Sequence, residues 1–94
     1  FGARTKKDLY YTKEFKDVEA MYPNFKYIPA LSTPLPEDEW DLDIGLITEV
    51  VARHTGDLSG HEAYLCGSPG MIDACIKVLR EKGMPEEHIY FDKF

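Results

Sequence analysis

The sequence is poor in cysteine, in cationic side chains and in long apolar runs. Its 94 residues include two cysteines and three histidines, too few for a disulfide framework and without the spacing of a zinc site. No apolar run approaches the roughly 20 residues of a membrane-spanning helix. Acidic residues outnumber basic ones by 17 to 11, giving a net charge of -6. We therefore expect no metal site, no membrane span and no nucleic-acid partner.

What is present has the composition of a small soluble domain, with 44% hydrophobic and 30% charged residues. The chain begins at Phe1, without an initiator methionine or the pattern of a secretory signal, which indicates a fragment of a longer protein. Because cysteines are few, a reducing cytoplasm is the expected compartment.

Glycine and proline divide the chain into segments that alternate between helical and strand patterns, which is typical of βαβ units. Three amphipathic helices are predicted: one after a possible N-cap at Thr12, one from Gly45 to Gly56, and one over 70–82. Strands are predicted over 25–31, 63–66 and 88–91.

Patterns within these segments give finer predictions. Pro29 has no N–H to donate, so the strand over 25–31 is expected at a sheet edge. The unbroken apolar run from Ala63 to Cys66 predicts a parallel strand buried on both faces. The acidic stretch 33–43 is expected to be an exposed loop anchored by Trp40. Two helices should turn apolar side chains inward: Phe15, Val18, Met21 and Tyr22 on the first, and Met71, Ile72, Cys75, Ile76 and Leu79 on the third.

The stretch Cys66-Gly67-Ser68-Pro69 joins a predicted strand to a predicted helix, at the carboxyl end of a strand, where ligands of open α/β sheets bind. Gly67 lets the backbone pass close to a flat ligand, and Ser68 offers a hydroxyl and an N–H. Pro69 suits the first helical turn, whose free N–H groups attract phosphate. From these residues alone, a cofactor-binding turn and an ordinary strand-to-helix turn are equally open.

Four segments, in order over nearly the whole chain, resemble the ferredoxin-reductase superfamily. The stretch 63–74 resembles its Cys-Gly-x-Pro-x-Met motif, and 1–11 resembles its Gly-x-Arg segment after the second strand of the NAD domain. The segments 29–32 and 91–94 match in the same order. Within the superfamily, the sequence is most similar to reductase components of bacterial phenol, methane and propane monooxygenases. It is equally similar to the flavin-containing subunit of sodium-pumping NADH:quinone reductases, which the stretch 34–40 suggests.

The resemblance implies an α/β fold: a partial Rossmann-like parallel sheet with flanking helices, lacking the first βα unit. Residues 1–94 would form the C-terminal part of an NADH-binding domain, and a Gly-rich phosphate loop would precede Phe1. In the family's strand order, 3-2-1-4-5, the missing strand is central. We therefore expect either a smaller sheet built from the 25–31, 63–66 and 88–91 strands, or self-association through an exposed strand edge.

The resemblance also implies an enzyme, an NADH-dependent FAD and iron–sulfur oxidoreductase. Hydride would pass from NADH to FAD, and single electrons would then pass to a [2Fe-2S] centre and to a quinone reductase or oxygenase partner. FAD-binding and ferredoxin-like domains would lie upstream in the same chain, so the fragment alone should be inactive. Its expected place is the cytoplasm, or the cytoplasmic face of the inner membrane through segments outside this sequence. The residues alone also leave open a non-catalytic α/β binding or interaction module.

Site roles follow from the same resemblance. Cys66 would lie near the nicotinamide C4 and orient it toward the flavin, which is positioning and not nucleophilic attack. The C-terminal Phe94 would stack on the flavin ring. Two groups of residues would bind the cofactor: Gly67, Ser68, Pro69 and Met71 at the nicotinamide and diphosphate, and Arg4, Thr5, Asp8 and Tyr10 near the adenosine ribose.

Each of these roles has a plainer alternative. Cys66 could be a small core residue, the segment at Arg4 a charged surface turn, and Phe94 a disordered terminus. Although Arg4, Lys6 and Lys7 could pair a 2′-phosphate, NADH is preferred over NADPH because the nearest relatives use it. Cys75 is assigned to the core.

Overall fold

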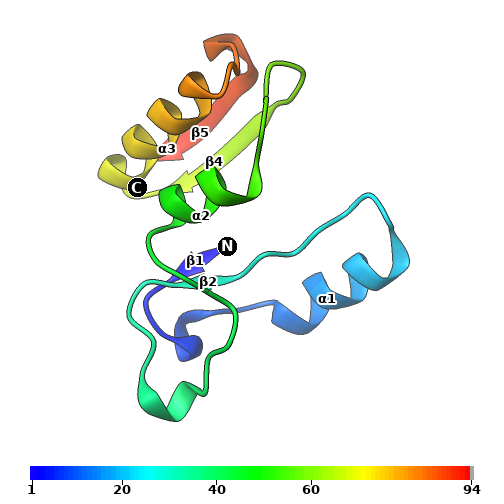
Figure 1. The fold of residues 1–94 in the computed structure, drawn as a ribbon, viewed down its shortest axis with the longest axis vertical. Coiled ribbons are helices and arrows are strands. Elements are labelled where there is room, and N and C mark those ends of the chain that lie inside the picture. Colours follow the sequence, from blue (N-terminus) through cyan, green and yellow to red (C-terminus); the bar gives the residue numbers. More distant parts are fainter. Residues whose placement is uncertain (94) are drawn as a thin grey trace. The chain divides into compact units, whose positions relative to one another are not determined.

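The computed structural model describes residues 1–93, which divide after Val50 into two compact units. The first unit contains a three-stranded parallel sheet of β1 (Gly2–Ala3), β2 (Ala30–Leu31) and β3 (Asp43–Ile44). The second contains a parallel pair, β4 (Ala63–Gly67) and β5 (Ile89–Lys93) (Figure 1). The helices are α1 (Thr12–Met21), α2 (Ile47–His54) and α3 (Pro69–Glu81), and short 3-10 turns cover Lys6–Asp8, Pro36–Asp38 and Glu86–His88. The predicted α/β class with parallel strands is confirmed.

In the first unit, β2 is the middle strand, so the prediction that Pro29 places this strand at an edge is wrong. The N–H groups of Ala30 and Ser32 donate to β1 and its flank, each at 2.9 Å, and the ladder with β3 starts only at Ala30. No ladder bond therefore needs a donor at position 29. The strand is also two residues long instead of seven, and both residues, Ala30 and Leu31, are fully buried.

The first helix starts one residue earlier than the predicted cap. Tyr11, not Thr12, is the N-cap, because the Tyr11 carbonyl accepts the first helical hydrogen bond, from the Phe15 N–H at 2.9 Å. Tyr11 has a left-handed backbone, with φ of 57°, which is uncommon for a residue other than glycine. The chain therefore turns sharply into α1.

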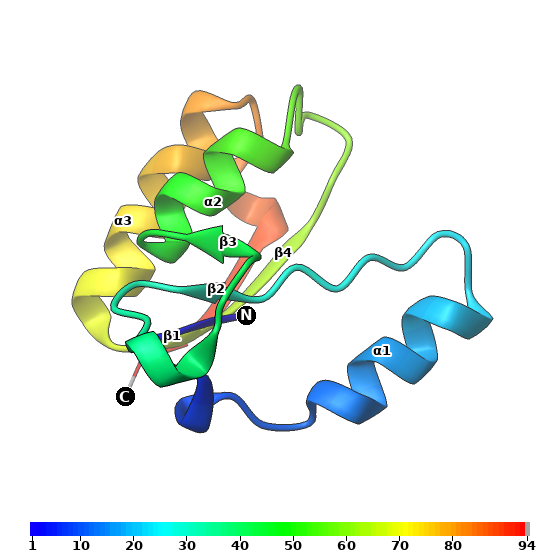
Figure 2. The ribbon, with the colours of Figure 1, turned by 60° about the horizontal axis from the view of Figure 1, so that its bottom comes forward.

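One side of α1 is covered by the extended segment that leads from this helix back to β2 (Figure 2). The Phe15 ring stacks on that of Tyr27 with centroids 5.3 Å apart, and the Tyr27 N–H donates to Glu19. Met21 and Tyr22, predicted on the inward face, are exposed. The segment passes over the start of the helix and leaves these later positions in solvent.

The acidic loop is anchored as predicted, because the half-buried Trp40 indole N–H donates to the Asp43 carbonyl at 2.8 Å. Asp43 itself lies in β3, a strand too short for its sequence pattern to reveal. Asp38 does more than interact with solvent: its Oδ2 accepts the backbone N–H groups of Lys6 and Leu35 at 3.2 and 2.9 Å. This carboxylate links the loop to the 3-10 turn that follows β1.

In the second unit, α3 packs on one face of β4 and β5 (Figure 1). Its helical periodicity was predicted correctly, with Ile72, Cys75 and Leu79 buried. The helix ends in a Schellman motif, in which Gly83 has φ of 95° and donates to the Arg80 carbonyl. Met84 donates to the Leu79 carbonyl, and both side chains enter a buried cluster completed by Leu58 and Ile89.

The strand β4 is covered on one face only, which corrects the prediction of burial on both. Its exposure alternates: Ala63 and Leu65 are half-buried, while Tyr64 is 75% exposed and Cys66 is exposed. On the open face the Tyr64 ring stacks on Tyr90, its register partner on β5, at 5.1 Å. An apolar run shows that a strand forms, but it does not show how many layers cover that strand.

The two sheets are separate, and no described strand joins them. The expectation of a smaller sheet that combines the 25–31, 63–66 and 88–91 strands is therefore wrong, because β2 pairs with β1 and β3. Self-association through a strand edge stays a prediction. Among residues 1–93, no helix has the length and apolarity needed to cross a membrane.

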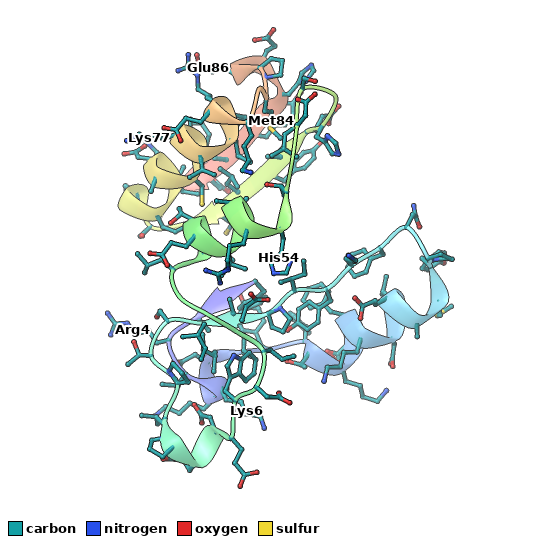
Figure 3. All side chains as sticks on the ribbon, in the orientation of Figure 1. Arg4, Lys6, His54, Lys77, Met84 and Glu86 are labelled. Carbon is teal, nitrogen blue, oxygen red and sulfur yellow. The ribbon has the colours of Figure 1, made fainter. Side chains whose placement is uncertain are left out.

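The buried cluster of the second unit predicts a large effect of Leu79→Ala. Removing this side chain, which is 6% exposed, should lower the free energy of unfolding by about 2–5 kcal/mol, because it deletes buried methyl groups and leaves a cavity. Urea unfolding followed by circular dichroism measures the change. Lys77→Ala, on the exposed side of the same helix (Figure 3), is the control. A loss below about 1 kcal/mol for Leu79→Ala would contradict its place in the core.

Candidate functional site

The junction between β4 and α3 is a capped turn at the carboxyl end of the parallel pair. Ser68 is the N-cap of α3, and its Oγ accepts the Met71 N–H at 3.4 Å. Pro69 occupies the first helical position, where no donor is needed and its fixed φ is already helical. The local sequence therefore fixes where the helix begins, and the backbone N–H groups of its first turn lie beside the end of β4.

Gly67 permits a close approach of helix and strand. Its φ is 154°, and a Cβ at this position would collide with Cε of Met71. The Met71 thioether in turn lies 3.6 Å from Sγ of Cys75. Cys75 is buried, as predicted, and burial raises the pKa of its thiol. The structure thus gives Met71 a packing role beneath the turn, while its contact with a cofactor stays a prediction.

Cys66 is an exposed thiol, which excludes the alternative of a small core residue. Leu65 and Gly67, on either side of it, are half-buried, so alternation along β4 turns Cys66 to the face opposite α3. Ser68 and Pro69 are also exposed. The turn therefore presents a thiol, a hydroxyl and the start of a helix on accessible surface.

The second group of predicted residues lies in the first unit, after the carboxyl end of β1. Thr5 and Asp8 bind each other: the Thr5 hydroxyl and N–H donate to Asp8 Oδ2 at 2.9 and 3.2 Å. Arg4 is only half-buried, and Lys6 beside it is exposed (Figure 3). Tyr10 is 61% exposed and packs edge-on against the Phe1 ring at 4.7 Å. These four predicted residues form one local cluster, consistent with a ligand-binding or a surface turn.

Phe94, predicted to stack on the flavin, lies outside the described residues. The neighbouring Lys93 was not singled out by the sequence. Its Nζ lies 3.0 Å from Oδ1 of Asp73, on α3. Two opposite charges 20 positions apart have no local signal, and only the parallel pairing of β4 and β5 shows why they meet. In the described part of the chain, no three His, Cys, Asp or Glu side chains gather as metal ligands.

Comparison with known proteins gives the family. The family model described as the oxidoreductase NAD-binding domain matches residues 1–77. The chain belongs to this family. In sequence, it is 41% identical over 100 positions to a subunit of the Na(+)-translocating NADH-quinone reductase of Neisseria meningitidis, and 43% identical over 94 positions to the phenol hydroxylase P5 protein of Acinetobacter pittii. These alignments cover 100% and 99% of the chain but only 24% and 27% of the relatives.

Solved structures agree with this assignment. The Amycolatopsis cytochrome P450 reductase GcoB matches with a TM-score of 0.86 and 28% identity, over 99% of the chain and 27% of that structure. The ferredoxin reductase in carbazole 1,9a-dioxygenase matches with a TM-score of 0.78 and 30% identity, with the same coverage. The resemblance to ferredoxin-reductase-type NAD-binding domains is confirmed, and the chain spans about a quarter of the length of these proteins.

The packing beneath the turn predicts that Gly67→Ala lowers the free energy of unfolding by about 1–3 kcal/mol, because the backbone is strained for any other residue and the methyl group meets Met71. Chemical denaturation measures the loss. Gly70→Ala, whose added methyl group meets nothing within 4 Å, should leave stability unchanged or slightly raised. If the Met71 contact causes the loss, Gly67→Ala and Met71→Ala together should cost less than the sum of the two single variants. Strict additivity would contradict this explanation.

The two cysteines should differ sharply in reactivity. In the native chain at about pH 8, a thiol reagent should modify Cys66 quickly and Cys75 only on unfolding, because Cys75 is buried and its raised pKa keeps the thiolate scarce. Mass spectrometry of peptides after timed alkylation assigns each site. Cys66→Ser should remove the fast phase, and Cys75→Ser should retain it. Fast modification of both thiols in the native chain would show that the packing around Cys75 opens.

Proposed function

We propose that residues 1–94 are the C-terminal part of an NADH-binding domain in a flavoprotein reductase. In this proposal hydride passes from NADH to FAD, and single electrons then pass to a [2Fe-2S] centre and to a quinone or oxygenase acceptor. Membership of an oxidoreductase NAD-binding family supports the first step. The names of the relatives, an NADH-quinone reductase subunit and a phenol hydroxylase protein, support the two kinds of acceptor.

The observation that carries the proposal is the exposed, capped turn formed by Cys66, Gly67 and Ser68 at the carboxyl end of β4. In open α/β sheets this is where nucleotide cofactors bind. The turn fits a nicotinamide: Gly67 carries no side chain, Cys66 is accessible, and nothing lies within 4 Å of the point where a Cβ on Gly70 would be. A flat ring can therefore approach the backbone closely.

The residues of this chain bind and orient the cofactor. When bound, NADH supplies the hydride that reduces the flavin. Cys66 limits the positions that the nicotinamide ring can take, Gly67 admits the ring, and the Ser68 hydroxyl and the first turn of α3 attract its polar and anionic groups. None of these roles requires a covalent bond to the protein, so Cys66 acts by contact.

The cluster of Arg4, Thr5, Asp8 and Tyr10 is proposed to bind the adenosine ribose. Hydroxyl, carboxylate and guanidinium groups supply both donors and acceptors for ribose hydroxyls. We propose NADH as the cofactor, in keeping with the name of the NADH-quinone reductase relatives. The cations Arg4, Lys6 and Lys7 would tolerate a 2′-phosphate, so a direct comparison of NADH with NADPH is informative.

The whole reductase would contain more than this chain. FAD-binding and ferredoxin-like domains would belong to the same polypeptide upstream, since about three-quarters of each relative lies outside the matched region. Without them, residues 1–94 should bind cofactor weakly and transfer no hydride. The protein would work in the cytoplasm, or at the cytoplasmic face of the inner membrane if its relationship to the quinone reductase extends to anchoring segments.

The test restores the upstream FAD-binding and Gly-rich segments and measures NADH-driven flavin reduction by rapid mixing. Cys66→Ala should slow hydride transfer on the order of tenfold to a hundredfold, because an ångström of misplacement costs that much. Cys66→Ser, closer in size, should retain more of the rate. Tyr64→Phe, on the same exposed face of β4, is the matched control and should keep the full rate. A normal rate in Cys66→Ala would refute its role, and a wild type that NADH does not reduce would refute the function.

A further inference from the structure

The strand β5 ends beside the candidate turn. Lys93 is the register partner of Gly67, so the last residue of β5 lies next to the residue at the centre of the turn. Its ammonium Nζ lies 3.0 Å from Oδ1 of Asp73, which is on α3. The ion pair therefore connects the end of the sheet to the helix on the other side of the turn.

The Lys93 side chain is held by more than its ion pair. Ile89, Phe91 and Lys93 alternate along β5, so they share a face, and Ile89 is buried in the cluster to which α3 contributes. The ammonium also lies 5.3 Å from the centre of the Phe91 ring, within the range of a cation–π interaction. Two partners therefore restrict a side chain that is only 38% exposed.

Two contacts thus join the start of α3 to the ends of the strands. The Met71 methyl group lies under Gly67 and limits how closely the helix approaches the strand. Such an apolar contact has no preferred direction, so it resists compression but not sliding. The Asp73–Lys93 pair links two fixed points by charge and hydrogen bonding, and it opposes sliding of the helix along the strand ends.

We propose that Asp73 and Lys93 are positioning residues that hold the turn formed by Cys66, Gly67 and Ser68 in the geometry needed for hydride transfer. The inference rests on the function proposed above, since the turn matters only if the nicotinamide binds there. It assigns these two residues no contact with the cofactor. Their effect on the rate passes through the turn, whose position depends on the helix start and on the strand end.

The exposure of the pair distinguishes this role from a purely structural one. With 38% and 65% of the two side chains exposed, solvent screens the charges, and such pairs contribute little to global stability. A structural role therefore predicts a small change in melting temperature and an unchanged rate. A positioning role predicts a small change in melting temperature and a slower reaction, because rates depend on sub-ångström geometry.

The main experiment uses the reductase with its upstream segments restored and follows flavin reduction over a range of NADH concentrations. Lys93→Gln and Asp73→Asn should each lower the limiting rate about threefold to tenfold, with little change in the apparent dissociation constant or melting temperature. The exchange variant, Lys93→Asp with Asp73→Lys, should recover at least half of the lost rate.

Arg80→Gln provides the matched control. It removes an ion pair to Glu86, at 3.9 Å, near the end of α3 that lies away from the turn (Figure 3), and it should leave the rate unchanged. Wild-type rates in both Lys93→Gln and Asp73→Asn, or no recovery in the exchange variant, would overturn the inference. A wild-type reductase that NADH does not reduce would instead refute the proposed function.

A second measurement needs no NADH and uses the 94-residue chain itself. If the pair fixes the turn, Lys93→Gln should change the alkylation rate of the Cys66 thiol at least about twofold, whereas Arg80→Gln should not. Equal rates in Lys93→Gln and the native chain would count against the inference even if the reductase proved inactive. The positioning role and the proposed function can therefore fail separately.

Discussion

The close approach of α3 to β4 at Gly67 is the constraint on which the second unit depends. Met71 occupies the space that a Cβ at position 67 would need, so the strand can meet the helix only through glycine. The same side chain reaches Cys75, in the buried face of α3. Packing under the turn therefore leaves Cys66 and Ser68 outside, and their accessibility is a consequence of the fit between helix and strand.

Local chemistry made this part of the fold predictable. The apolar period of α3, Pro69 at its first position and the glycine at 83 act over a few residues, and each agrees with the structure. The exposed side of β4 was not predictable, because Tyr64 and Cys66 are as apolar as buried strand residues. Whether a face is covered depends on another layer, and a strand's own residues do not encode it.

The first unit shows the opposite balance. Its strands have two residues each, too few for an alternating pattern, so β3 was absent from the prediction and β2 was placed at an edge. Pro29 does lack a ladder donor, but the ladder begins one residue later. The candidate site was located by a resemblance over ordered motifs. The ion pair of Lys93 and Asp73 was missed because it depends on tertiary pairing.

The two predicted halves of the cofactor site use their polar groups differently. The turn at Cys66 and Ser68 keeps its side chains accessible, so it can receive a ligand without breaking a buried contact. Near β1, Oδ2 of Asp8 already accepts two hydrogen bonds from Thr5. A ribose hydroxyl must therefore use another oxygen or displace Thr5, at the cost of about one hydrogen bond. The chain is thus better prepared for the nicotinamide end of a dinucleotide than for its adenosine end, and binding energy gained elsewhere in the reductase must offset that difference.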